Sequence, residues 1–298
     1  MKKLFTAIML MVLPIAVWAQ DDSTEEVDTT WITGGDVALN FSNVSLSNWA
    51  GGGQSSISLG GIFNTFAKME DDRNLWQTDL QLAYGLIKQG DNELRKSDDA
   101  ILLISQYGYK LTKHWHLSTK FDFRTQFAPG YNFPEDVDGL EQKQLISEFM
   151  APGYLLFSPG ITYTKKKFSA TLSPATAKWT FVLNDSLATA GAYGVDPEKN
   201  VRTQIGMNFA AAYEKEIAKN VTFSTLLNLF NDYETFGLID VNWETLFIMK
   251  VNEWLSTSFT TQLIYDDDID VIRNEDPNDV GPAVQWKNVL NVGVIVKF

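Results

Sequence analysis

The chain has 298 residues, of which 45% are hydrophobic and 20% charged, and its formal net charge at pH 7 is −13. This acidic balance argues against nucleic acid as a partner, because binding phosphates requires a basic surface. The absence of cysteine excludes disulfides, metal sites built on thiolates and lipid attachment through a cysteine.

The first residues have the pattern of a secretory signal. Lys2 and Lys3 precede an apolar run over residues 4–17, and residues 17–19 (VWA) resemble a cleavage site. The run is shorter than the roughly 20 residues that a membrane-spanning helix needs. We predict three parts, namely a signal peptide over residues 1–19, an acidic, disordered periplasmic tail over 20–30, and one folded domain over 31–298.

Twelve later segments alternate between apolar and polar side chains, which is the pattern of a strand with one apolar face. Within residues 115–127, for example, Phe121 and Phe123 fall on one face and Asp122 and Arg124 on the other. Most segments reach the roughly 9–11 residues that a membrane-crossing strand requires. They cover residues 33–44, 53–68, 74–88, 98–112, 115–127, 152–164, 167–183, 200–217, 220–235, 239–251, 255–266 and 284–298.

The connections between these segments alternate between short turns and longer loops. An even strand number, short periplasmic turns and longer external loops are typical of outer-membrane barrels. Tryptophans fall near both ends of the segments, as expected for two aromatic belts; they are Trp76, Trp115 and Trp254 near the short turns and Trp179, Trp243 and Trp286 near the loops. We therefore predict an all-β fold, a transmembrane antiparallel up-and-down β-barrel of twelve strands. A soluble sandwich or lipocalin-like barrel stays open, because period two alone does not distinguish a core from lipid.

The segment 152–183 contains a break in the alternation. Pro159 and Pro174 lie at similar distances from the turn at Lys166, and the apolar phase changes after Pro174. Proline lacks a backbone donor and is confined to edges or bulges in sheets. We interpret this as a paired bulge that bends the wall. The alternative is a locally weak contact between strands that is used for gating or for a partner.

The last segment has Trp286, Leu290, Val292, Val294, Val296 and Phe298 on its apolar face. It resembles the closing strand of a bacterial outer-membrane barrel, whose insertion machinery reads such a terminus. Several stretches together resemble a Bacteroidetes outer-membrane β-barrel family described as a domain of unknown function; they are residues 46–53 (LSNWAGGG), 96–99 (KSDD), 107–109 (YGY), 125–127 (TQF), 149–154 (FMAPGY), 173–174 (SP) and 192–195 (AYGV). The resemblance implies the fold and an outer-membrane location. It supplies no activity, substrate or catalytic residue.

Charged and amide side chains alternate with the apolar ones and are expected to face the lumen. The candidates are Gln77, Asp79, Lys120, Asp122, Arg124, Lys178, Arg202, Glu244, Lys250 and Lys287. Their mixed signs favour a salt-bridged plug over an open pore of one sign. Twelve strands lie between filled eight-stranded barrels and the porins with 16–18 strands. The lumen could therefore be narrow and wet, or closed.

Catalytic and metal chemistry find little support in the sequence. The two histidines, His114 and His116, lie at a predicted short turn and are interpreted as solvated turn residues, so we expect no enzyme. No cofactor is expected, with one exception in the acidic loops. Asp266, Asp268 and Asp270 alternate and could bind Ca²⁺ through oxygen. The alternative for these acidic loops is a solvated surface that repels lipopolysaccharide.

Three functions remain open at this point, and the position of the histidines disfavours one of them, an enzyme embedded in the membrane. The other two are non-catalytic. One is a porin-like narrow channel or transporter for small solutes in the bacterial outer membrane. The other is a non-catalytic accessory or structural subunit of an outer-membrane assembly. The expected partners are outer-membrane lipid and lipopolysaccharide, the outer-membrane insertion machinery during assembly, and other outer-membrane proteins.

Overall fold

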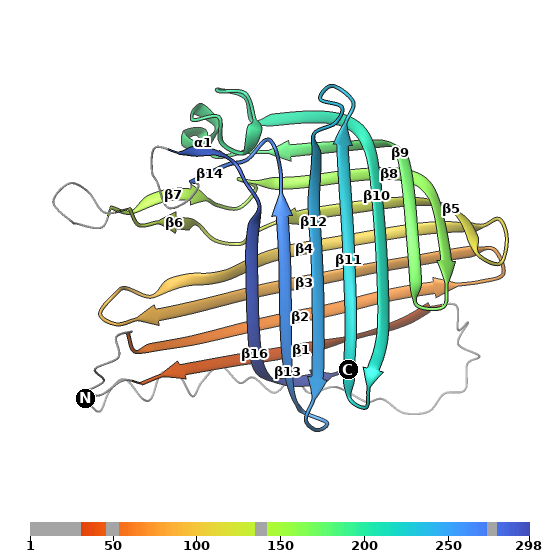
Figure 1. Ribbon diagram of the computed structural model, residues 1–298, viewed down its shortest axis with the longest axis horizontal. Coiled ribbons are helices and arrows are strands. Elements are labelled where there is room, and N and C mark those ends of the chain that lie inside the picture. Colours follow the sequence, from red (N-terminus) through yellow and green to blue (C-terminus); the bar gives the residue numbers. More distant parts are fainter. Residues whose placement is uncertain (1–30, 46–53, 135–141, 273–278) are drawn as a thin grey trace, which may run out of the picture.

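The computed structural model describes residues 31–45, 54–134, 142–272 and 279–298. In this part of the chain, twelve strands form a closed antiparallel barrel (Figure 1). They are β1 (Trp31–Val44), β2 (Ser56–Glu70), β3 (Asn74–Gln89), β4 (Arg95–Lys110), β5 (Trp115–Thr125), β8 (Gly153–Lys165), β9 (Phe168–Phe181), β10 (Val201–Ala218), β11 (Val221–Asp232), β12 (Ile239–Lys250), β13 (Leu255–Tyr265) and β16 (Gln285–Lys297). The predicted fold class and strand number are confirmed. The signal peptide and tail predicted for residues 1–30 lie outside the described residues.

Each barrel strand pairs with its neighbours along the chain, and β16 pairs with β1 to close the ring. In Figure 1 the strands β10 to β16 cross in front of β1 to β5, as expected for two walls of a barrel with tilted strands. We call the end with the short turns the turn end and the opposite end the loop end. In outer-membrane barrels the longer loops are external.

The outer face of the barrel is apolar because the strands alternate. On β1, Val37, Leu39 and Phe41 point outward and are exposed, whereas Asp36 and Asn40 line the interior. Trp31 lies against Trp76 at the turn end, with their ring centroids 6.0 Å apart. One tryptophan departs from the predicted belts, because Trp254 lies in a turn and lines the interior cavity.

The contact between β1 and β16 is the shortest ladder of the ring. It has five residue pairs, from Asp36 with Lys297 to Asn40 with Gly293, whereas β16 makes ten pairs with β13. Gly35 and Phe298 extend it by exchanging both backbone hydrogen bonds, at 3.0 and 3.1 Å. The ring of Phe298 also stacks on Phe63, with centroids 6.0 Å apart.

The proline segment forms a bulge in β9. Between the pairs Phe157 with Ala177 and Ile161 with Leu172, β9 has one residue more than β8. The pairing of β9 with β10 shifts at the same place. Ser173 and Thr176 are both buried, while Pro174 between them is exposed. The extra residue explains the change of apolar phase and confirms the predicted bulge; a role in gating or partner binding stays a prediction.

The loops at the loop end contain secondary structure that the alternation did not indicate. Two small hairpins form, β6 (Gly130–Asn132) with β7 (Gln144–Ser147) and β14 (Asp270–Ile272) with β15 (Val280–Pro282). The connection from β9 to β10 contains the helix α1 (Asp185–Thr189) and the 3₁₀ turn η1 (Ala192–Gly194). Within the described ranges, no helix is long and apolar enough to span a membrane.

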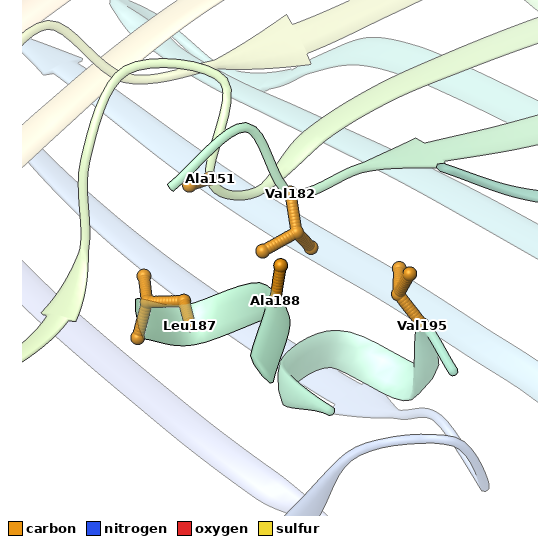
Figure 2. Packing of buried hydrophobic residues seen from close by; sticks show 5 residues of the cluster. All are labelled: Ala151, Val182, Leu187, Ala188 and Val195. Atoms are coloured by element: carbon orange, nitrogen blue, oxygen red, sulfur yellow. The ribbon is translucent and has the colours of Figure 1, made fainter. Parts of the chain in front are cut away.

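A cluster of buried apolar residues lies among these loops. Figure 2 shows Leu187 and Ala188 of α1 beside Val182 and Ala151, with Val195 at the edge. Asn184 caps α1, since its side-chain oxygen accepts a hydrogen bond from the amide of Leu187 at 3.0 Å. The buried residues inside the barrel are mainly polar, so most of the buried apolar residues that the structure describes belong to this cluster, which we call the loop core.

Candidate functional site: the polar lumen

The structure places the ten lumen candidates on the inner face of the barrel. Arg124, Glu244, Lys250 and Lys287 line one cavity, and Lys178 lines a second one. The other five share a face with a lining residue because side chains alternate with a two-residue period. Gln77 and Asp79 share the face of Gln81, and Lys120 and Asp122 share that of Arg124. Arg202 shares the face of Gln204, whose register partner is Lys178.

One side of the lumen is filled by hydrogen-bonded polar side chains. The hydroxyl groups of Ser118, Thr162 and Thr171 form a chain with two contacts of 2.7 Å. His116 lies on the same face and is 6% exposed. The interpretation of His116 as a solvated turn residue was therefore wrong, because β5 already turns this side chain into the lumen. His114 is at the turn, and its Nδ1 lies 3.0 Å from the carbonyl oxygen of Thr164.

Asp122 is the most buried charge of the inner wall and is 1% exposed. Its two carboxylate oxygens accept hydrogen bonds from Nε and Nη2 of Arg124, at 2.8 and 2.9 Å. Lys120 forms a second ion pair with it, at 2.9 Å. A bidentate contact of this kind fixes the plane and direction of the guanidinium group. Arg124 is therefore held in one orientation.

A second group of charges at the loop end connects strands that are three positions apart in the ring, and we call it the clasp. Lys178 of β9 contacts Asp240 of β12 at 2.8 Å and Asp266 at 3.6 Å. Arg202 of β10 contacts Asp268 at 2.7 Å. The clasp therefore ties β9 and β10 to β12 and to the segment after β13.

The clasp includes Asp266 and Asp268, two of the three residues, with Asp270, that the sequence suggested as calcium ligands. The first two carboxylates already face cationic side chains, and the side chain of Asp270 lies outside the described residues. Among the side chains that are described, no group of three His, Cys, Asp or Glu residues could hold a metal ion. Calcium binding stays a prediction.

Asp99 holds the loop after β5 in place. Its carboxylate accepts hydrogen bonds from the amides of Phe127 and Ala128, at 2.7 and 2.9 Å, and pairs with Lys96 at 2.8 Å. Nearby, the hydroxyl of Thr125 donates to the carbonyl of Pro152 at 3.1 Å. These residues belong to stretches that carry the family resemblance, so those stretches have a structural role here. The alternation alone did not assign this role.

Tyr193 of η1 connects the loop core to the lumen. Its hydroxyl donates a hydrogen bond to the carbonyl of Ile146, at 2.5 Å, and its ring lines the cavity below the loops. Burial raises the pKa of the Tyr193 phenol to about 12, and a hydrogen bond with Ser147 opposes this rise. The loops from β5 to β8 and from β9 to β10 are thereby joined at the loop end.

The other side of the lumen is hollow. A cavity of about 510 Å³ extends from the turn residues Asn252 and Glu253 to Asp98 and Lys287. A second cavity of about 440 Å³ lies below the loops and is lined by Tyr193 and by clasp residues. We call them the lower and upper cavities. A smaller one of about 240 Å³ shares Glu244 with the lower cavity.

One ion pair crosses the lumen at the upper part of the lower cavity. Nζ of Lys287 on β16 lies 3.4 Å from Oδ1 of Asp98 on β4, although β1, β2 and β3 separate these strands around the ring. The two side chains are 54% and 45% exposed, respectively. An ion pair with this exposure is typically worth about 0–1 kcal/mol, so its contact opens easily.

Comparison with known families gives one partial match. Residues 41–131 match the model of a family described as "Protein of unknown function (DUF3078)". This confirms the predicted likeness to a family of unknown function, whereas the Bacteroidetes origin stays a prediction. No curated protein matches the sequence.

Solved structures with a similar fold include three bacterial barrels. An outer membrane channel from Pseudomonas putida F1 has a TM-score of 0.41 and 13% identity, and the alignment covers 94% of this chain and 100% of that one. The translocator domain of the autotransporter NalP from Neisseria meningitidis has a TM-score of 0.35 and 9% identity, with 92% and 90% covered. The β domain of the Bordetella autotransporter BrkA has a TM-score of 0.34 and 11% identity, with 88% and 98% covered. These likenesses concern the barrel fold alone.

The protein is a β-barrel of the bacterial outer membrane that sits in lipid. Its ring is closed, so every barrel strand has partners on both sides. Its outward side chains are apolar and exposed, as on β1 and β16, while the charges point inward. A closed barrel of this kind satisfies its backbone hydrogen bonds within the bilayer, which open sheets do not.

Proposed function

We propose that the protein is a narrow channel that lets small polar solutes cross the outer membrane. The observation that carries this proposal is the pair of lumen cavities, which share Arg124, Thr125 and Gln262 among their lining residues. Together they extend from the turn end to the space below the loops. Because polar side chains fill the rest of the lumen, only a narrow path remains for a solute.

The charges along the lower cavity support a path that favours neither anions nor cations. Four acidic and four basic residues line it, namely Asp36, Asp98, Glu244 and Glu253, and Arg124, Lys250, Lys287 and Lys297. At the loop end the clasp and the loop core restrict the path, while the half-exposed pair of Asp98 and Lys287 is the weakest contact across it. We expect low conductance with occasional wider states.

The test is conductance of the refolded protein in planar bilayers, together with swelling of liposomes in small sugars and amino acids. We expect small single-channel steps and faster swelling with smaller solutes. Asp98→Asn should increase conductance because it removes the weak contact, whereas Glu253→Gln in the turn serves as a matched control. Absence of steps and of swelling in folded protein would reject the channel.

A second candidate function is an accessory subunit of a larger outer-membrane assembly. The observation that favours it is the exposure of large apolar side chains at the loop end, where Phe236 is 75%, Phe149 56% and Leu183 52% exposed. Crosslinking and pull-down from native membranes test it. Recovery of the barrel without other outer-membrane proteins would count against this function.

The proposed channel has no catalytic step and needs no cofactor. Both histidines lie at the turn end, and the contact of His114 is with a backbone carbonyl. Assays of phospholipid and peptide hydrolysis by the folded protein test this, and turnover by purified barrel would contradict it. Lipopolysaccharide and the insertion machinery are proposed to contact the protein because it lies in the outer membrane, and not to bind in its lumen.

A further inference from the structure

The junction between the two cavities is formed by facing strands. Arg124 and Thr125 of β5 and Gln262 of β13 are the side chains that line both cavities. In the ring of twelve strands, β5 and β13 are six positions apart in either direction. They therefore lie on opposite walls, and a solute that moves between the cavities passes between them.

One wall of the junction has a fixed positive charge. Asp122 holds Arg124 through two hydrogen bonds and also pairs with Lys120, so the three groups together have one net positive charge. The Arg124 side chain is 31% exposed, which leaves part of the guanidinium group open to lumen water. Because the bidentate contact fixes its orientation, this charge is in place before any solute arrives.

The opposite wall has a negative charge at the same level. Glu244 of β12 is the register partner of Gln262 on β13, and it lines the lower cavity. Arg124 lines the same cavity from β5, five positions away around the ring of twelve strands. The junction thus places opposite charges on facing walls of a narrow space, and the low-dielectric walls concentrate the field across it.

We propose that Arg124 and Glu244 select solutes at this junction, favouring small zwitterions such as free amino acids over ions of one sign. A zwitterion can turn its two charges toward the opposite walls. A simple anion or cation meets attraction from one wall and repulsion from the other. This inference rests on the proposed channel function and names its solute class.

The test is the reversal potential of single channels under a KCl gradient. We expect the wild type to be nearly unselective between the two ions. Arg124→Gln should favour cations by several-fold. Lys120 and Asp122 then remain as a neutral pair, Lys287 beside Gln262 stays paired with Asp98, and Glu244 no longer faces the charge of Arg124 on the opposite wall. Glu244→Gln should favour anions by a similar factor. Glu216→Gln, at an exposed carboxylate near the turn end that lines neither the lower nor the upper cavity, is the matched control and should change the ratio less than twofold.

Liposome swelling tests the solute class directly. The ratio of the swelling rate in glycine to that in an uncharged polyol of similar size should fall several-fold in both Arg124→Gln and Glu244→Gln, and Arg124→Lys should partly restore it. Glu244 lies outside the Asp122 cluster, so its variant remains informative if Arg124→Gln does not fold. A conducting wild type whose variants keep both ratios would overturn the selectivity and leave the channel intact. A folded wild type without conductance or swelling would overturn the channel and the selectivity with it.

Discussion

Replacing Gly35 by alanine is expected to weaken the ladder at which the barrel closes. Gly35 exchanges two backbone hydrogen bonds with Phe298. A Cβ atom at this position would lie 2.4 Å from the carbonyl oxygen of Asn64 and 2.6 Å from Cζ of Phe298. Both distances are shorter than carbon contacts in folded proteins allow, so the ring of Phe298 or the strand β1 must move.

The size of the effect follows from what Phe298 would lose. Two backbone hydrogen bonds contribute about 0.5–1.5 kcal/mol each. The stacked pair of Phe298 and Phe63 adds about 0.5–1.5 kcal/mol. We therefore expect Gly35→Ala to lower the free energy of unfolding by about 2–4 kcal/mol. The ladder between β1 and β16 has only five further pairs to compensate.

The assay is equilibrium unfolding in urea in lipid vesicles, followed by tryptophan fluorescence. The matched controls are Gly60→Ala and Gly61→Ala on the neighbouring strand β2, where a Cβ atom would find its nearest neighbours at 3.8 and 3.7 Å. Those variants should stay within about 1 kcal/mol of the wild type, since removing glycine also reduces the entropy of the unfolded chain. If Gly35→Ala unfolds at the same urea concentration as these controls, the closure argument is wrong.

Three further predictions concern charges and the loop end. Asp122→Asn should lower the free energy of unfolding by about 3 kcal/mol or more, because it leaves two cations without their buried partner. The control is Glu214→Gln, at an exposed ion pair, which should lower the free energy of unfolding by less than about 1 kcal/mol in the same urea titration. The pKa of Tyr193 is raised from 10.0 to about 12, so the folded state retains this phenol proton longer than the unfolded state. The stability should therefore fall as pH rises from 10 towards 12. Tyr193→Phe should make this fall less steep, and ultraviolet absorbance of tyrosinate should show one group fewer titrating near pH 12. Isothermal titration with Ca²⁺ checks the acidic loop, where binding should release heat that is reduced in Asp268→Asn, and absence of heat in the wild type would reject the calcium site.

Strand positions could be predicted because lipid on one side and a polar lumen on the other impose a strict two-residue period. The errors lie at strand ends, where other interactions replace the ladder. The segment predicted over 115–127 ends at Thr125 in the structure, because the amide of Phe127 donates to Asp99 instead of to a neighbouring strand. The segment predicted over 167–183 ends at Phe181, because Val182 packs into the loop core.

The loop core could not be predicted from periodicity. Its helix α1 has five residues, which is too short to show a helical period. The one available signal was Asn184, a residue type preferred at the start of helices, followed by Asp185 in the first turn. Such a signal is common in loops without helices, and only the contacts with Ala151 and Val182 show why a helix forms here.

The pairing of charges across the lumen depends on information that alternation does not contain. Alternation assigns a side chain to the inner face, but the partner opposite depends on strand tilt and stagger around the ring. Lys178 and Asp240 are 62 positions apart in the sequence, and Asp98 and Lys287 are 189 apart. The mixed signs of the lumen-facing charges therefore predicted ion pairs, but the sequence did not indicate which residues form them.

The structure divides the inward charges into two groups with different consequences. In the clasp, Lys178 is 9% exposed and already has both acidic partners, so a substitution there should change stability and the opening of the loop end. At the junction, Arg124 is held from behind by Asp122 and still reaches the lumen, opposite Glu244. Among the described residues, the clasp is the part of the lumen that corresponds to the predicted salt-bridged plug. Glu244 lies outside the Asp122 cluster and faces the space of the junction, so its substitution should alter which solutes pass more than how stably the barrel folds.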